Sequence, residues 1–335
     1  MNSYSLIIET ENLSIADSSC LWACLDSVQA AIGRVAPPVE ALLINTGDVS
    51  PSMLAMLEKK YPWVSLVHSP PGENYYEIKM RGVGLATADL VVFVDSDCSY
   101  NEDWLAGLLE PFDNSKVRIV AGETGFVDRG PYGLALAVAH SFDGFSGGTD
   151  LYLVNNYYAN NVAFRRSVLF NLPIPTGLPL YRHGCSAHCV ELRRAGEQIW
   201  AQPRSRAMHA APEGLAHFFW RFLLFGRDRA VRSRLGLVDD APKASSGGSG
   251  VIPVVRRRLE RSLKLQPSQR KWIPAASLIV LAAFILIRAG QVLSRFRPQL
   301  AIEYFATIEN LHYPTMDDYK KSISPGDASE SRGSA

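Results

Sequence analysis

The first 130 residues alternate short apolar runs with stretches of helical periodicity. Continuous or β-rich apolar runs predict strands at 5–8, 41–44, 63–68, 89–95 and 117–121. Apolar residues at helical spacing predict helices at 21–32, 51–60, 76–86 and 104–112. This alternation favours βαβ units around an open, mostly parallel sheet, in which ligands bind beyond the carboxyl ends of the strands.

The pattern resumes after a region rich in glycine and small residues, 122–148, which it does not assign. At 160–170 an asparagine pair precedes an apolar run, and a helix is predicted from Arg165 or Arg166. A further helix at 188–195 ends at Gly196, a typical C-terminal glycine, and a strand follows at 198–201. We therefore assign residues 1–212 to one α/β domain.

The C-terminal third has a different composition. Residues 213–236 are aromatic, apolar and basic, which is typical of an interfacial amphipathic helix, with a helix packed on the sheet as the alternative. Glycine and serine between 237 and 255 predict a flexible linker, and 256–295 combines a basic segment with an apolar helix. The polar tail, 296–335, is expected to be largely disordered.

The apolar run at 274–293 bears on localisation. It has roughly the 20 residues that a membrane span requires, although Arg288 and Gln291 interrupt it. Trp272 and the preceding Arg and Lys residues match the anchors found at membrane interfaces. A span and an interfacial helix both remain open, and a buried soluble helix is the alternative. No secretory signal opens the chain, so we expect a membrane-associated protein with a cytoplasmic catalytic domain.

Overall charge and cysteine content exclude some classes of function. The formal net charge of +1 gives no general attraction to nucleic acid, which we do not expect as a partner. The five cysteines are odd in number and scattered, so a disulfide framework is not expected.

The sharpest chemical signal is Asp95-Ser96-Asp97, directly after the most apolar predicted strand. Two carboxylates at the carboxyl end of such a strand can converge on one ligand. A divalent cation that bridges a diphosphate uses one or two carboxylates and leaves its other positions to phosphate and water. This position therefore suits a metal that neutralises charge on a departing nucleoside diphosphate.

Five segments carry a resemblance to a known family: 5–12, 42–47, Asp95-Ser96-Asp97, 160–166 and 192–209. Together they resemble the inverting glycosyltransferases of family 2, from about residue 5 to about residue 228. The resemblance implies a GT-A type nucleotide-binding sandwich with a mostly parallel central sheet, to which C-terminal membrane-associated helices would be added. Glu9 stands where the family usually has proline, and Asn45 where it has aspartate.

The resemblance also implies site residues and a cofactor. The nucleotide-sugar would contact Thr10, Glu11, Asn45, Arg81, Asp95 and Ser96. A divalent metal, Mn²⁺ or Mg²⁺, would be held by Asp95, Asp97 and His209, and the acceptor would approach Asn160, Asn161 and Arg165.

One departure concerns the catalytic base. The family usually has a Glu-Asp pair eleven or twelve residues before the glycine that matches Gly196, and here Gly184 and Cys185 occupy those positions. An inverting transfer needs a group that takes the acceptor proton. The nearby alternatives are His183, His188 and Glu191.

We therefore expect a metal-dependent inverting glycosyltransferase that moves a sugar from a UDP- or GDP-linked donor to a lipid, lipid-linked or polysaccharide acceptor. A non-catalytic nucleotide-sugar-binding or scaffold relative that lacks the base is the first alternative. A nucleotidyltransferase is a weaker one, because Glu9-Thr-Glu-Asn12 is acidic and has no glycine to cradle a triphosphate.

Overall fold

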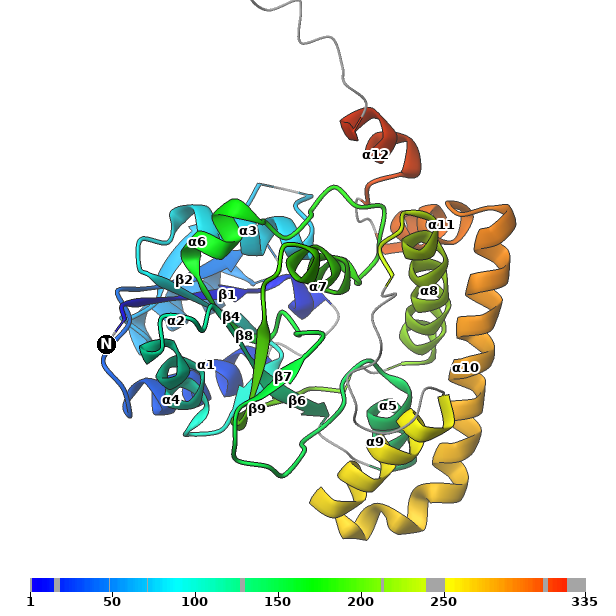
Figure 1. The fold of residues 1–335 in the computed structure, drawn as a ribbon, viewed down its shortest axis with the longest axis horizontal. Coiled ribbons are helices and arrows are strands. Elements are labelled where there is room, and N and C mark those ends of the chain that lie inside the picture. Colours follow the sequence, from blue (N-terminus) through cyan, green and yellow to red (C-terminus); the bar gives the residue numbers. More distant parts are fainter. Residues whose placement is uncertain are drawn as a thin grey trace, which may run out of the picture.

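The computed structural model describes residues 2–14, 19–47, 49–70, 72–126, 130–211, 214–238, 251–309 and 313–323. Within these residues one nine-stranded mixed sheet has the order β3-β2-β1-β4-β8-β6-β9-β5, and β7 pairs with β9. The sheet and its flanking helices form one side of the molecule, and a layer of helices forms the other (Figure 1).

The first half of the sheet is parallel. Its strands are β1 (Tyr4–Glu9), β2 (Glu40–Asn45), β3 (Ser65–His68) and β4 (Leu90–Asp95). The connecting helices are α1 (Ser19–Ile32), α2 (Pro51–Lys60) and α3 (Tyr75–Leu85). Every residue of β1 and β4 is buried, as continuous apolar runs require when helices cover both faces of a sheet. The predicted elements of this half are confirmed.

The second half contains antiparallel pairs that the sequence did not indicate. Strand β8 (Asn161–Arg165) lies antiparallel between β4 and β6 (Ile119–Phe126). Strand β9 (Ile199–His209) runs parallel to β6 and pairs antiparallel with β5 (Cys98–Tyr100) and β7 (Tyr152–Val154). Helices in this half are α4 (Trp104–Leu109), α5 (Gly130–Ala139), α6 (Arg166–Asn171) and α7 (Gly184–Arg194).

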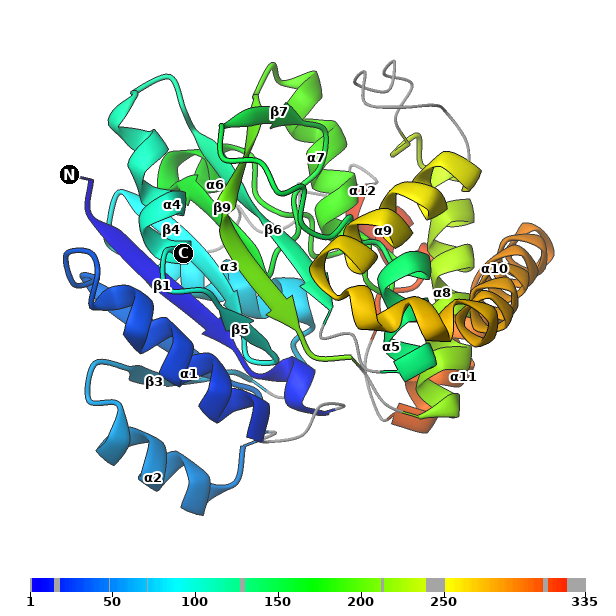
Figure 2. The same cartoon turned by 90° about the horizontal axis from the view of Figure 1, so that it is seen from below.

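The helical layer contains α5 and the C-terminal helices. These are α8 (Leu215–Arg234), α9 (Val251–Leu265), α10 (Ile273–Phe296), α11 (Leu300–Glu309) and α12 (Met316–Ile323). Helix α10 forms the outer edge, and α8 lies between it and the sheet (Figures 1 and 2).

Helices α8 and α10 approach each other closely through two glycines. A Cβ on Gly226 would lie 1.9 Å from the carbonyl oxygen of Ile287, and one on Gly290 would lie 1.9 Å from that of Leu223. Only glycine permits backbones this close. The crossing therefore fixes α10 against α8 rather than leaving it as a free appendage.

Two expectations for the C-terminal third need correction. Residues Arg221 to Asp228 of α8 are buried, so this helix is packed against the sheet domain and α10 rather than being interfacial along its length. The tail is not disordered throughout, because α11 and α12 lie in it and Ile302 and Phe305 of α11 are buried. Most of the linker expected at 237–255 lies outside the described residues.

Candidate active site

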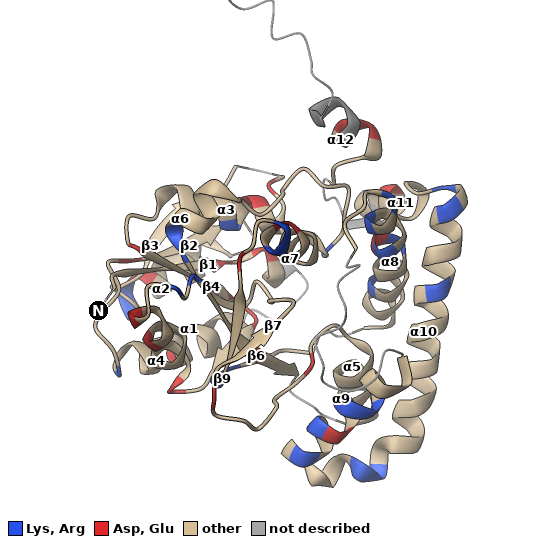
Figure 3. Cartoon of the chain, in the orientation of Figure 1, with Lys and Arg blue, Asp and Glu red and all other residues tan. Residues whose placement is uncertain are grey.

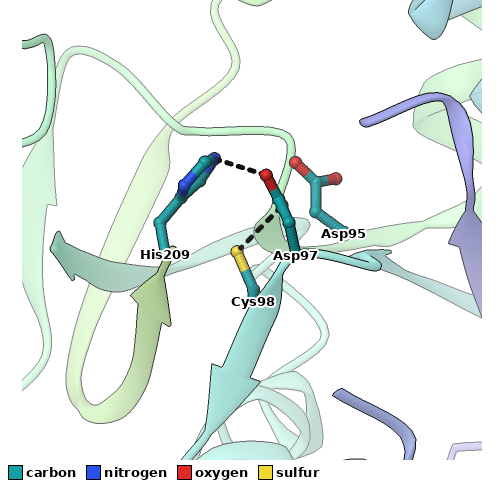
Figure 4. Close-up of side chains that lie close together, drawn as sticks. All are labelled: Asp95, Asp97, Cys98 and His209. Carbon is teal, nitrogen blue, oxygen red and sulfur yellow. Dashed lines mark hydrogen bonds and ion pairs between the residues drawn. The ribbon is translucent and has the colours of Figure 1, made fainter. Parts of the chain in front are cut away.

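Four polar side chains meet at the carboxyl edge of the sheet. Asp95 ends β4, Asp97 follows two residues later, and the pairing of β5 with β9 sets Cys98 opposite His209. The Asp97 carboxylate and His209 Nε2 are 3.3 Å apart. One ligand atom from each of Asp95, Asp97, Cys98 and His209 lies within 4.8 Å of the others (Figure 4). The sequence placed three of these four residues together correctly.

The Asp95 carboxylate is held in place by its neighbours. Lys79, which is fully buried on α3, donates to Asp95 Oδ1 at 2.7 Å. The Tyr75 hydroxyl donates to the same carboxylate at 2.8 Å, and Asn12 donates to its Oδ2 at 3.2 Å. A buried carboxylate needs such partners, since desolvation would otherwise favour its neutral form. The orientation of Asp95 is therefore set by α3 and the loop after β1.

Glu9, which stands where the resembled family has proline, anchors that loop. Its carboxylate accepts from the Asn12 side chain at 2.9 Å and from the Asn12 backbone at 3.2 Å. Burial raises the pKa of Glu9 well above its usual range, and the charge of Asp95 raises it further. Glu9 thus fixes Asn12 against Asp95 and Asp97.

The donor set fits a hard divalent cation. Two carboxylates and one imidazole are ligands that suit Mn²⁺ and Mg²⁺. Burial raises the pKa of the Cys98 thiol well above its usual range, and Asp97 and Asp95 raise it further. A protonated thiol is a poor ligand. Asp95, Asp97 and His209 are therefore the residues that would hold the metal.

A cavity opens beside these residues, between the sheet edge and the helical layer. Of the residues expected from the sequence, Asp95, Asn160, His183 and His209 line it. Arg182, His140 on the loop after α5, and Arg221 on α8 also line it. The cavity thus joins the Asp95 carboxylate of the sheet to cations and imidazoles from the loops and helices around it.

His183 lies at the start of α7 and is oriented by a residue of α8. Its Nδ1 is 3.0 Å from the carboxylate of Asp228, which is fully buried. The backbone amides of Tyr181 and Arg182 also donate to Asp228, at 2.9 and 3.0 Å. Burial raises the pKa of Asp228, but the hydrogen bond from His183 and the charge of Arg227 outweigh it, so the net pKa is lowered.

This arrangement leaves the other ring nitrogen of His183 for chemistry. In a neutral ring whose Nδ1–H donates to the Asp228 carboxylate, Nε2 is the nitrogen that can accept a proton. His183 is 18% exposed and lines the cavity, so solvent or a ligand can reach the ring.

The other two base candidates lie elsewhere. His188 is buried, with its Nδ1 2.7 Å from the Tyr157 hydroxyl and its Nε2 2.8 Å from the Leu172 carbonyl. Burial lowers the pKa of His188 to about 4. Glu191 is half-buried further along α7, and neither residue lines the cavity. The His188 ring and the Glu191 carboxylate therefore lack access to a substrate held in the cavity.

The residues expected to contact the nucleotide lie at the carboxyl edge of the sheet, with one exception. Thr10 directly follows β1, and Asn45 is the last residue of β2. Thr10 Oγ1 donates to the Ile44 carbonyl at 3.2 Å. Glu11 pairs with Arg182 at 2.7 Å, which joins the loop after β1 to the loop before α7. Ser96 Oγ is buried and has no hydrogen-bond partner among the described residues. Arg81 instead pairs with Glu73 away from the cavity.

Of the three residues expected to contact the acceptor, only Asn160 lies at the cavity. Asn160 lines the cavity, whereas Asn161 accepts from the Trp104 indole at 2.7 Å and donates to two backbone carbonyls in the core. Arg165 pairs with Leu90, at the opposite end of β4 from Asp95, because β8 runs antiparallel. Its guanidinium donates to the carbonyls of Val117 and Phe112. Arg165 is therefore a structural residue, and its expected acceptor role is wrong.

Sequence reasoning missed the residues that α8 contributes. His217, Arg221 and Asp228 recur at positions i, i+4 and i+11, which lie on one face of a helix. The available signal was the spacing of these polar residues among the apolar residues of the first two-thirds of α8. Lys79 and Tyr75 were also missed, although they share the face of α3 that packs on Asp95.

A protein-family model described as "Glycosyl transferase family 2" matches residues 5–171. The chain is 25% identical over 160 residues to the glucosyl-dolichyl phosphate glucuronosyltransferase of Haloferax volcanii, covering 42% of this chain and 49% of that protein. It is 26% identical over 113 residues to the human polypeptide N-acetylgalactosaminyltransferase 10, covering 32% and 19%. The matches thus span less than half the length of these relatives.

Two solved structures share the fold. A mannosyltransferase of Pyrobaculum calidifontis, PcManGT, in complex with GDP-Man and Mn²⁺, is similar with a TM-score of 0.53 at 16% identity, over 92% of this chain and 84% of that one. The structure of GalNAc-T7 with UDP, GalNAc and Mn²⁺ is similar with a TM-score of 0.51 at 12% identity, over 79% and 56%. At these identities the likeness establishes the α/β fold of GT-A structures.

Proposed function

Because this chain belongs to glycosyl transferase family 2, we propose that it is a metal-dependent, inverting glycosyltransferase that uses a UDP- or GDP-linked sugar. The observation that carries the proposal is the meeting of Asp95, Asp97 and His209 at the rim of a cavity that also holds the oriented His183. Similar structures were obtained with GDP-Man or UDP and with Mn²⁺, which supports this donor class and metal.

The donor side of the site is the sheet edge. Thr10 and Glu11 follow β1, and Asn45 ends β2. The nucleotide would lie along this edge, beside the carboxylate of Asp95 at the end of the neighbouring β4. Asp95, Asp97 and His209 would hold the metal, which would supply positive charge for the leaving diphosphate. Lys79 and Tyr75 keep Asp95 oriented without a ligand present, so little reorganisation is needed on binding.

The base is His183, and Asp228 is its positioning residue. The acceptor hydroxyl oxygen bonds to the anomeric carbon on the face opposite the nucleoside diphosphate, and the bond from that carbon to the phosphate oxygen breaks. The hydroxyl proton passes to His183 Nε2. Asp228 then stabilises the imidazolium through Nδ1. A histidine thus replaces the carboxylate that the family uses, and catalysis does not require the missing Glu-Asp pair.

The acceptor is proposed to come from a membrane surface. Among the described residues, the helical run Pro267–Phe296 is long and apolar enough to cross a bilayer, and only 17% of its most apolar window is buried. Its inner face, with Ala276, Ala283 and Gly290, packs on α5 and α8. Most of the large residues that point outward are apolar, namely Leu278, Leu281, Ile285, Val292 and Phe296, and Arg288 and Arg295 are exposed as well.

This packing favours an α10 that lies in the membrane plane. A spanning α10 would carry α8 into the bilayer with it, and exposed Arg229 and Arg234 would enter hydrocarbon. In the plane, the apolar outer face of α10 enters the lipid, while the long Arg and Lys side chains along α9 and on α10 extend to the headgroups (Figure 3). A lipid or lipid-linked acceptor fits this arrangement, and one relative acts on a glucosyl-dolichyl phosphate, as its name states.

The test is the thermal stability of the purified chain with UDP, GDP and their sugar conjugates, with and without Mn²⁺. A ligand at 100 times its Kd stabilises the folded state by about 2.7 kcal/mol, which shifts the melting temperature visibly. We expect a metal-dependent shift with one nucleotide, followed by sugar transfer to a lipid extract. If no nucleotide shifts the melting temperature, the chain is a non-catalytic relative and the proposal is wrong.

A further inference from the structure

Arg221 is a buried cation without an acidic partner. It is 7% exposed on α8, lines the cavity, and among the described residues no carboxylate lies within ion-pair distance of it. Its guanidinium donates instead to two imidazoles, His217 Nε2 at 2.7 Å and His140 Nε2 at 3.0 Å. Buried charges in proteins are normally paired, because desolvation of an isolated ion is unfavourable.

The two imidazoles leave that charge in place. Burial, followed by the charge of Arg221, lowers the pKa of His140 well below its usual range and that of His217 to about 3. Both rings are therefore neutral and act as acceptors for Arg221. They orient the guanidinium but supply no negative charge.

His140 provides a second, independent sign of a missing ligand. It is 5% exposed and lines the same cavity, and its Nδ1 has no hydrogen-bond partner among the described residues. Since Nε2 accepts from Arg221, Nδ1 carries the ring proton and is a donor without an acceptor. An unsatisfied buried donor beside an unpaired buried cation is the arrangement that an oxyanion completes.

We propose that Arg221 and His140 bind a phosphate group of one of the two reactants. The site belongs to α8 and the loop after α5, and both helices pack on the apolar helix α10, whereas the residues that would hold the metal belong to β4, β9 and the loop after β4. The inference deepens the proposed function and rests on it. The phosphate is either that of the nucleotide donor or that of a lipid phosphate acceptor, which enters from the α10 side.

The first experiment tests the site with phosphates alone. The full chain and its Arg221→Met variant are titrated calorimetrically with pyrophosphate and with a short-chain isoprenyl phosphate, without metal. We expect wild type to bind and Arg221→Met to bind at least about tenfold more weakly, which is the usual effect of losing a charged hydrogen-bond partner. Arg221→Lys, which keeps the charge, should restore part of the affinity.

Stability of the ligand-free protein separates a binding role from a structural one. If Arg221 waits for an anion, Arg221→Met removes an unpaired buried charge, so its melting temperature should equal or exceed that of wild type. A lower melting temperature together with unchanged phosphate binding would overturn the proposal. The variant His140→Phe keeps the ring packing, and it should weaken phosphate binding while leaving the fold intact.

The last arm identifies the source of the phosphate. If Arg221→Met raises the Kd of the nucleoside diphosphate in Mn²⁺, the site holds the donor; if it raises the KM of a lipid phosphate acceptor, the site holds the acceptor. Either result supports the inference. Wild-type behaviour of Arg221→Met with both ligands contradicts it, while nucleotide binding that still depends on Asp97 leaves the proposed function standing.

Discussion

The sheet half of the molecule and its helical layer contribute to one cavity by different means. In the sheet half, the strand arrangement brings Asp95, Asp97 and His209 together, because β4 and β9 end, and β5 begins, at the same edge. In the helical layer, α8 and the loop after α5 direct Asp228, Arg221 and His140 toward that edge. The sheet supplies the carboxylates, and the helices supply the cations and the residue that orients the base.

The two regions also differ on their outer surfaces. The largest apolar residues of β1 and β4 are covered by helices on both faces. Helix α10 instead buries a narrow face of small residues and exposes large ones, such as Leu278 at 70% and Phe296 at 80%. The same layer that completes the cavity therefore also presents the apolar surface that we assign to a membrane.

The largest expected effect comes from the sheet half. Asp97→Asn should abolish Mn²⁺-dependent nucleotide binding and lower the rate of sugar transfer by about 10³-fold. The metal would lose a charged ligand, and the negative charge of the leaving diphosphate would no longer be neutralised. Calorimetric titration with the preferred nucleotide, with and without Mn²⁺, measures it. Unchanged metal dependence in this variant would show that the carboxylates do not hold the metal.

The next effect tests the helical layer. Asp228→Asn should lower kcat by roughly 100-fold, since the base loses its orienting carboxylate. It should also destabilise the fold by about 3–5 kcal/mol, because fully buried Arg227 loses the one carboxylate within ion-pair distance of it among the described residues. Kinetics and urea unfolding measure the two effects, and normal kcat in a folded variant would show that α8 has no part in catalysis.

The same residue gives a pH dependence with a defined sign. The folded-state pKa of Asp228 is lowered, so its contribution to stability is complete above the unfolded value, about 4, and is lost as pH falls through the folded value. Wild type should therefore lose stability on acidification below about pH 4 more steeply than Asp228→Asn. Equal acid slopes in thermal melts of the two proteins would contradict the assigned ion pairing.

A smaller effect concerns the outer face of α10. Replacing Leu281 and Ile285 with serine should weaken binding to anionic lipid vesicles by about tenfold or more for each residue, because each apolar side chain contributes about 1.5–3 kcal/mol on burial. Nucleotide binding should not change. Met56→Ser, at an equally exposed apolar position of the sheet half, is the matched control. Equal loss of vesicle binding in the control would remove α10 as the membrane surface.

The smallest effect on activity is expected at Arg165. Arg165→Gln should leave the acceptor KM unchanged, because the guanidinium bonds to backbone carbonyls at the far end of β8. It should cost about 1–3 kcal/mol of stability through the unsatisfied carbonyls. A raised KM with normal stability would return Arg165 to the acceptor site.

Local pattern predicted the elements of the sheet half because apolar runs and helical periodicity are local signals. The direction of β8 is not encoded in that pattern. Asn161 and Arg165 were therefore placed together, although they lie roughly 13 Å apart along the strand. The roles of Asp228 and Arg221 depend on how α8 packs over the cavity, which is set by contacts between residues distant in the sequence, such as Gly226 with Ile287 and Gly290 with Leu223. The metal motif was predictable because it directly follows one strand.

The central claim is that His183, oriented by the helical layer, replaces the usual carboxylate base. The direct measurement compares donor binding and sugar transfer in wild type and His183→Gln, with His188→Gln as the matched control. The account predicts unchanged Mn²⁺-dependent donor binding in both variants, and a loss of transfer of about 100-fold or more in His183→Gln alone. Transfer at the wild-type rate in folded, donor-binding His183→Gln would contradict it.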